Sequence, residues 1–184
     1  MKIVAPHLLP CLFPAPLVLV SCGTMQNPNI ITIAWAGTVN SNPPMVSVSI
    51  RPERHSYDLI KKSGLFIVNL VSQELLKEAD FCGVKSGRDI NKFEATKLTP
   101  VEWREHDIPY IKESPVSLCC KTSQLIQLGT HTMFIGEIIE IFVKEEFLES
   151  TGKLKLEAAG LVSYISPQYH LQGEVLGRYG YSVV

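Results

Sequence analysis

The sequence has 184 residues, of which 46% are hydrophobic, and its formal net charge at pH 7 is −1. This length and composition predict one globular domain over residues 1–184 and exclude a disordered chain, because the apolar content suffices for a large core. The 17 basic and 18 acidic residues form no long run of one sign, which argues against a nucleic-acid-binding protein with a basic surface.

The first apolar segment is interrupted by prolines at positions 6, 10, 14 and 16. A membrane-spanning helix needs about 20 unbroken apolar residues and the core of a signal peptide is continuous, so we expect neither here and no membrane partner. Residues 19–22 (Leu-Val-Ser-Cys) resemble a lipoprotein cleavage site. We instead predict a strand over residues 17–22, after an extended lead that the prolines stiffen.

The five cysteines contain no C-x-x-C pair, and Cys119 and Cys120 are adjacent. This pattern predicts neither a zinc site nor a disulfide framework, and we assign no metal ligands. A reducing cytoplasm is the simplest location for such a chain, with the cysteines acting as small core residues.

Residues 29–56 contain the most informative pattern. Apolar residues alternate with small or hydroxyl residues around Ile31 and Ile33 and again around Val46 and Val48, which is typical of strands with one buried face. The segment 37–44 between them is polar and uncharged, and we expect a loop there that offers many hydrogen-bonding groups.

A basic turn follows the second of these strands. Arg51, Arg54 and His55 precede Ser56, the predicted N-cap of a helix over residues 56–64 that ends at Gly64. Free N–H groups at a helix start bind phosphate, so a flat polar ligand would fit along the loop with its anionic tail here. An ordinary hairpin loop and a capped helix explain the same residues equally well.

A short buried strand over residues 66–71 and a helix over residues 73–81 come next. The following segment, 84–93, gathers Lys85, Arg88 and Lys92 around Ser86 and Gly87. Because glycine lets a backbone approach an anion closely, this segment is a candidate phosphate site; its alternative interpretation is a solvated basic loop. We expect residue 89, an aspartate, to cap the short helical turn that carries the last lysine.

The remainder of the chain reads as mostly β. We expect a covering loop over residues 94–115, an antiparallel hairpin over residues 116–143 with its turn near residue 129, and a charged excursion over residues 144–157. A last strand is predicted over residues 161–165. The tail over residues 169–181 is too rich in glycine for a long helix.

Several familiar catalytic motifs are absent, including the P-loop, G-x-G-x-x-G, H-E-x-x-H and G-x-S-x-G. The histidines have no metal-ligand spacing, and His131 alone is more typical of a structural histidine than of a catalyst. The sequence therefore favours a protein that takes its chemistry from an organic cofactor.

Four stretches, in this order, resemble the flavin reductase-like, FMN-binding split-barrel family, and in particular its flavoredoxin-type branch. They are N-x-I-T-I-A-W-x-G from residue 29, N-S-x-P-P with S-I-R-P-x-R-H-S over residues 40–56, C-G with S-G-R-D and K-F over residues 82–93, and G-T-H-T-M-F-I-G-E over residues 129–137. The resemblance covers most of the chain. It implies a mainly β fold, an antiparallel split barrel of Greek-key type with short peripheral helices, and a homodimer with FMN near the subunit boundary.

The resemblance also implies which residues contact FMN. The best matches to flavin-contacting positions of the family are Asn29, Trp35, Ser56, Lys92, His131 and Tyr164. Ala34 and Trp35 would form a wall for the ring, although a core tryptophan is the simpler interpretation of the latter. The ring edges would meet Thr38, Val39, Asn40 and Ser41, and the phosphate would meet Arg51, His55, Ser56, Ser86, Arg88 and Lys92.

Electron transfer through FMN is the implied reaction, and two functions remain open. One is an NAD(P)H-dependent flavin reductase that takes electrons from NADH or NADPH and passes them to a partner or to free flavin. The other is a non-enzymatic, FMN-bound electron carrier that exchanges electrons with a redox protein. Neither requires a side-chain acid or base, so no catalytic residue is assigned and His131 is kept only as a candidate.

Overall fold

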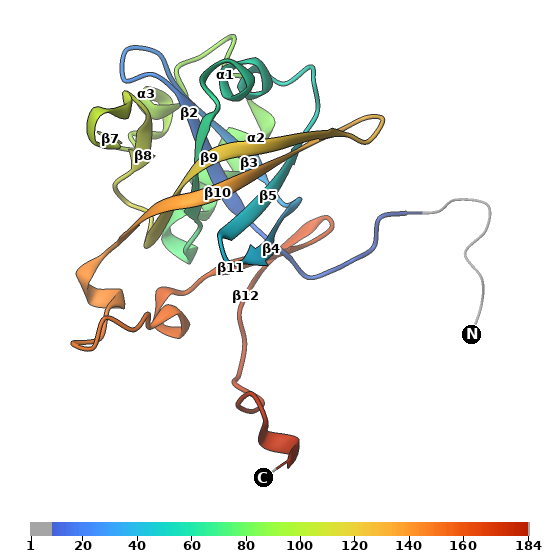
Figure 1. Cartoon of the computed structure of the whole chain (residues 1–184), viewed down its shortest axis with the longest axis vertical. Coiled ribbons are helices and arrows are strands. Elements are labelled where there is room, and N and C mark those ends of the chain that lie inside the picture. The colour runs from blue at the N-terminus through green and yellow to red at the C-terminus, as the bar shows by residue number, and fades with distance from the viewer. Residues whose placement is uncertain (1–8, 184) are drawn as a thin grey trace.

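The structure is a computed structural model that describes residues 9–183. Its centre is a seven-stranded sheet of order β3-β2-β6-β9-β10-β5-β4 in which every neighbouring pair is antiparallel (Figure 1). The strands are β2 (Val18–Gly23), β3 (Pro28–Ile33), β4 (Ala36–Ser41), β5 (Pro44–Ile50), β6 (Leu65–Leu70), β9 (Val116–Gln127) and β10 (Thr132–Val143). The predicted mainly β, antiparallel split barrel is confirmed.

Alternation along these strands builds the main core. Val48, Phe66 and Phe134 are fully buried on one face of the curved sheet, because successive side chains of a strand point to opposite faces. The backbone at Gly136 lies directly against this core, where an added Cβ would stand 2.5 Å from the ring of Phe66. Register shifts between β9 and β10 occur beside this glycine, and such bulges bend a sheet.

Two smaller sheets complete the fold. One contains β1 (Ala15–Pro16), β11 (Val162–Ile165) and β12 (Gln168–Leu171); the other pairs β7 (Pro100–Glu102) with β8 (Pro109–Ile111). The expected covering loop over residues 94–115 is therefore partly regular. Trp103, between β7 and β8, is buried and donates its Nε1–H to Glu140 over 2.8 Å, so this segment is packed core rather than a loose cover. The strand at 162–165 is also not the last one, because β12 follows it.

The helices are short, as expected. They are α1 (His55–Ser63), α2 (Leu76–Val84) and α3 (Lys92–Thr96), with 3-10 turns at Gln73–Leu75, Arg104–His106, Glu145–Phe147, Leu156–Ala159 and Tyr181–Val183. Gly64 ends α1 in the left-handed conformation, as predicted. Ser56 is not the N-cap of α1, since Arg54 holds that position. Asn91, rather than the aspartate two residues earlier, caps α3 by accepting from the N–H groups of Phe93 and Glu94.

The predicted polar loop over residues 37–44 is wrong. Residues 36–41 form β4, the edge strand that pairs with β5, and only a tight turn at Asn42 and Pro43 connects the two. After β12, the tail over residues 172–183 extends away from the body (Figure 1), and Leu176 and Tyr179 are almost fully exposed. Among the described residues, no helix has the length and apolar character needed to cross a membrane.

Candidate functional site

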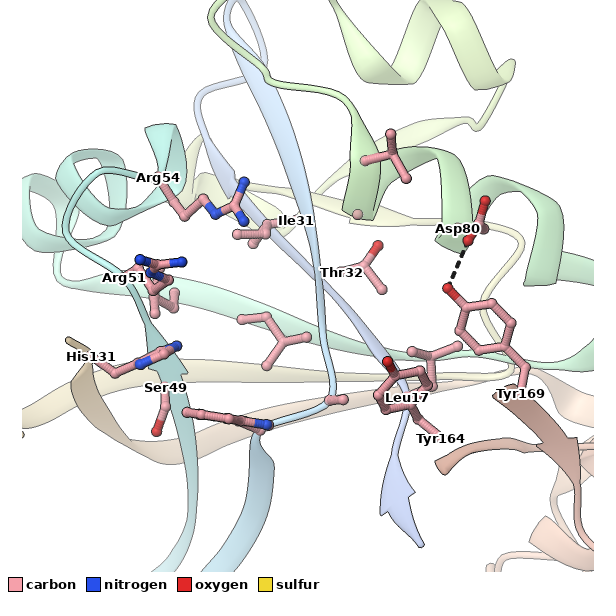
Figure 2. Close-up of a pocket in the computed structure, with 16 residues that line it drawn as sticks. Leu17, Ile31, Thr32, Ser49, Arg51, Arg54, Asp80, His131, Tyr164 and Tyr169 are labelled. Atoms are coloured by element: carbon pink, nitrogen blue, oxygen red, sulfur yellow. Dashed lines mark hydrogen bonds between the residues drawn. The ribbon is translucent and has the colours of Figure 1, made fainter. Parts of the chain in front are cut away.

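A cleft of about 450 Å³ opens between β3, the end of β5, α2 and the β11–β12 hairpin (Figure 2). It is lined by Leu17, Ile31, Thr32, Ile33, Ala34, Trp35, Ser49, Ile50, Arg51, Arg54, Asp80, Gly83, Val84, His131, Tyr164 and Tyr169. Its volume lies within the range of small-molecule sites, and its lining combines apolar walls with a few polar groups, which is typical of such sites.

The two sides of the cleft differ in chemistry. Figure 2 shows Arg51, Arg54 and His131 on one side and Asp80 with two tyrosines on the other. Trp35 is 45% exposed and its ring lies 4.3 Å from that of His131, tilted by 34°. A half-exposed indole in a cleft is an available surface for a planar ring, so the core interpretation of this tryptophan is not what the structure has.

A second, smaller pocket of about 110 Å³ continues from the cleft, sharing Ile31, Arg54 and Gly83 with it. Its lining is Asn29, Ile31, Glu53, Arg54, His55, Ser56, Cys82, Gly83, Lys85, Ser86, Gly87, Arg88 and Lys92. The lining contains four lysines or arginines, one histidine and a single carboxylate, that of Glu53. This carboxylate pairs with Arg51 over 2.8 Å. Arginine, lysine and histidine donors of this kind suit a phosphate monoester.

Burial in this pocket, with help from its cations, changes the pKa of His55. Burial, and then the charges of Arg88 and Lys92, lower the pKa of this imidazole below its usual value, against a weaker opposing effect from Asp58. A neutral imidazole at neutral pH can still donate one N–H to an anion.

Lys92 is the most deeply placed cation of the site. Only 3% of its surface is exposed, and its Nζ donates to the carbonyl oxygens of Ile30 and Cys82, each over 2.7 Å. Burial lowers its pKa, while the two neighbouring cysteines oppose that shift. An ammonium group has three donors. The bonds within the described part of the chain use two of them, which leaves one for a ligand in the small pocket.

The pocket floor depends on a close backbone approach. Asn29 is buried and donates its Nδ2–H to the Oγ of Ser56 over 2.7 Å. Gly87 lies so near that a Cβ there would stand 1.9 Å from the Oδ1 of Asn29 and 3.1 Å from the ring of His55. Only glycine fits this position without a shift of the neighbouring chain. The loop is anchored by Arg88, which donates to the carbonyl oxygen of Glu53 over 2.6 Å.

The structure therefore brings most of the residues named from the sequence into one continuous site. Those lining the cleft or the small pocket are Asn29, Ala34, Trp35, Arg51, His55, Ser56, Ser86, Arg88, Lys92, His131 and Tyr164. Ser86 additionally accepts from the backbone N–H of Arg88 over 3.2 Å. The segments that supply these residues lie far apart in the sequence and meet only through the fold.

Four named residues do not reach the site. Thr38, Val39, Asn40 and Ser41 lie on the exposed edge strand β4 and line neither cavity. Asn40 instead donates to the carbonyl oxygen of Pro43 within its own turn, over 2.8 Å. The prediction that they border a ring assumed a loop along which the ligand lies, whereas these residues form the edge strand β4.

The prediction from the sequence did not include several of the residues that line the cleft. Ser49 follows from strand alternation, because Val48 and Ile50 face the core and the residue between them must face the other side. Thr32 also lines the cleft, but so do its neighbours Ile31 and Ile33, so alternation along β3 does not single it out. Asp80 and Tyr169 carry no local signal, since their positions in the site come from tertiary packing alone.

His131 lies at the rim of the cleft. Its Nδ1 is 3.0 Å from the Oγ1 of Thr130, and burial, then Arg51, lowers its pKa. Among residues 9–183, no group of three or more His, Cys, Asp or Glu side chains is placed to hold a metal ion.

Residues 10–162 match the flavin reductase like domain family. The structure is similar to that of the flavoredoxin of Desulfovibrio vulgaris (Miyazaki F), with a TM-score of 0.89 and 32% identity over 100% of this chain and 98% of the other. The flavoredoxin of Methanosarcina acetivorans gives a TM-score of 0.88 at 25% identity, covering 99% and 96% of the two chains. The reductase component of a FADH(2)-dependent resorcinol hydroxylase of a Rhizobium species is 27% identical over 72% of this chain and 73% of its own.

Proposed function

Because this chain belongs to the flavin reductase-like family and to its flavoredoxin branch, we propose that it binds FMN and transfers electrons through it. The observation that carries this proposal is the junction of a ring-sized cleft with a small cationic pocket. The cleft would take the isoalloxazine and the small pocket would take the terminal phosphate. We propose FMN rather than riboflavin because the small pocket suits a phosphate, which riboflavin lacks. We do not propose FAD because the sequence has no recognisable adenine-binding motif.

The residues present fit this cofactor. Lys92 offers its remaining donor, Arg88 and His55 add N–H groups, and Ser56 and Ser86 add hydroxyls at the pocket wall. The close approach of the loop at residue 87 sizes the pocket for a compact group. Charge-assisted hydrogen bonds of this kind are about twice as strong as neutral ones, so the phosphate end would supply much of the affinity.

When bound, FMN would supply the capacity to accept and donate one or two electrons. The chain's own residues position the ring and control access to it. Trp35 and His131 offer two adjoining, tilted aromatic rings on one side of the cleft, and Tyr164 closes the other. Arg51 and Arg54, which line the cleft, attract anionic molecules to it. Positioning of this kind requires no side chain to move a proton.

We propose, first, that the protein is an NAD(P)H-dependent flavin reductase. Two observations support this function: the similarity to a reductase component, and the cationic side of the cleft, which suits a phosphate-bearing donor such as NADH or NADPH. The reduced protein would then pass electrons to a partner protein or to free flavin.

The second candidate is a non-enzymatic electron carrier, which the similarity to two flavoredoxins favours. In that function a redox protein, instead of a nicotinamide nucleotide, would deliver the electrons. The geometry of the FMN site would be the same, so the two functions differ only in what docks at the cleft mouth.

We further propose that the chain forms a single domain and that two chains form a homodimer, with the cleft near the subunit boundary. Ile139 and Ile141 on β10 are about half exposed, and the extended tail carries Leu176 and Tyr179 almost fully exposed. Large apolar side chains in such positions are typical of a surface that another chain covers. The five free cysteines agree with the proposed location in a reducing cytoplasm.

Anaerobic mixing with pyridine nucleotides separates the two functions. Purified, FMN-loaded protein is mixed with NADH or NADPH, and the flavin absorbance is followed. Rapid bleaching by either nucleotide supports the reductase. Failure of both nucleotides, together with bleaching by a reduced iron–sulfur protein, supports the carrier. If the protein binds no FMN at all, both functions are wrong.

A further inference from the structure

The β11–β12 hairpin forms one wall of the cleft and is joined to the body mainly at its base. There the N–H of Val162 donates to the carbonyl of Val71 over 3.0 Å, and the N–H of Gln73 donates to the carbonyl of Gly160 over 2.9 Å. β11 also pairs with the two-residue strand β1, whereas β12 is the edge of its small sheet. A wall held in this way needs a second attachment nearer its middle if it is to keep a fixed position.

One side-chain hydrogen bond supplies that attachment. The hydroxyl of Tyr169, in β12, donates to Oδ1 of Asp80, in α2, over 2.7 Å, between residues 89 positions apart in the sequence (Figure 2). Both side chains line the cleft. Burial, together with this bond, raises the pKa of Tyr169 to about 12, so the hydroxyl keeps its proton and remains a donor at neutral pH.

The same tyrosine supports a second cleft-lining residue that is proposed to contact the flavin. Its ring lies 5.6 Å from that of Tyr164, and both rings pack against the buried cluster that contains Leu17, Ile30 and Ala79. The packing keeps the two rings together, but apolar contact is not directional. The hydrogen bond to a carboxylate is directional and fixes how far β12 stands from α2.

We propose that Tyr169 and Asp80 are positioning residues for the bound flavin, because their hydrogen bond holds the β11–β12 hairpin against α2 and so keeps the cleft wall closed. This inference rests on the proposed FMN site. Loss of the bond would leave the hairpin held by its base, by β1 and by apolar packing, so that β12 could move farther from α2. Flavin would then leave the cleft faster, while the main core would be unaffected.

The first test measures the rate of FMN release by the rise of flavin fluorescence after dilution. Tyr169→Phe removes only the hydroxyl, and Asp80→Ala removes the whole carboxylate, both the acceptor and its charge. We expect each variant to release FMN about 3- to 10-fold faster than the unaltered protein, the effect of one hydrogen bond. Asp80→Asn keeps an acceptor oxygen and should stay within about twofold. The double variant should be no faster than either single variant, because the two residues make one bond.

Ser163→Ala is the matched control. It removes a side-chain hydrogen bond, from the hydroxyl of Ser163 to the carbonyl oxygen of His170 over 3.3 Å, that lies within the hairpin and outside the cleft lining. It should leave FMN release unchanged. Release rates of Tyr169→Phe and Asp80→Ala within twofold of the unaltered protein would overturn the inference, as would additive effects in the double variant.

Hydrogen exchange on the flavin-free protein tests the attachment itself. In Tyr169→Phe, backbone amides of residues 163–171 should exchange faster, while those of β2 and β6 keep their protection and the thermal unfolding temperature shifts little. Unchanged exchange in the hairpin would refute the attachment even if FMN binds normally. Failure of the unaltered protein to bind FMN would instead refute the proposed function.

Discussion

Replacement of Lys92 by methionine is the most informative single change, because this lysine links the fold to the proposed phosphate site. Methionine keeps most of the buried aliphatic length and removes the ammonium group. The carbonyl oxygens of Ile30 and Cys82 then lose their donor inside the protein. An unsatisfied buried acceptor costs about 1–3 kcal/mol. Removal of the desolvated charge, whose burial lowers the lysine's pKa, offsets part of that cost.

We therefore expect the flavin-free Lys92→Met protein to be less stable by about 1–3 kcal/mol in urea unfolding. FMN affinity should fall separately by about 10- to 150-fold, the effect of one charged hydrogen bond to the phosphate. Fluorescence titration measures that affinity at urea concentrations lower than those at which the protein begins to unfold.

Lys77→Met, an exposed lysine of α2 outside the small pocket, is the control and should change stability by less than about 0.5 kcal/mol. Flavin-free Lys92→Met as stable as the unaltered protein would refute the structural part of the reasoning. Equal FMN affinity would refute the phosphate contact.

Three further predictions concern the pocket floor, the thiols and the assembly. Gly87→Ala drives a methyl group into Asn29 and should weaken FMN binding about 5- to 150-fold. Gly173→Ala, with open space around it, should leave FMN binding unchanged. Equal FMN affinities of the two variants in a fluorescence titration would contradict the prediction. At pH 8 a disulfide reagent should react with only the exposed Cys11 in the native protein and with all five cysteines in urea. The other four are buried, and burial raises the pKa of their thiols, to about 11 for Cys22. Fast reaction of a second thiol in the native protein would count against this prediction. Sedimentation equilibrium of the FMN-loaded protein should give twice the mass of one chain, and the mass of a single chain that retains its flavin would exclude the homodimer.

The parts of the fold that could be predicted from the sequence are those with a periodic or stereochemical signal. Alternation gave β3 and β5, the β-branched residues gave β10, and the left-handed residue Gly64 gave the end of α1. β4 gave no such signal. Thr38 to Ser41 are exposed on an edge strand, so there is no buried face to impose alternation, and polar residues there are indistinguishable from a loop.

The site shows the same division. The basic segment near residue 88 and the helix start near residue 56 were both visible as local clusters of donors, and the fold joins them in one pocket. The burial of Lys92 was not predictable, because lysine is rarely buried and its two carbonyl partners come from distant elements.

The most direct test of the proposed flavin site compares the affinities of the protein for FMN and for riboflavin, which differ only by the phosphate. If Lys92, Arg88 and the neighbouring hydroxyls bind that phosphate, FMN should bind at least about 100-fold more tightly, since two or more charge-assisted hydrogen bonds separate the ligands. Arg88→Ala should narrow that difference while it leaves riboflavin binding unchanged. Equal affinities for the two flavins, or no binding of either, would contradict the assignment of the cleft and its cationic pocket to FMN.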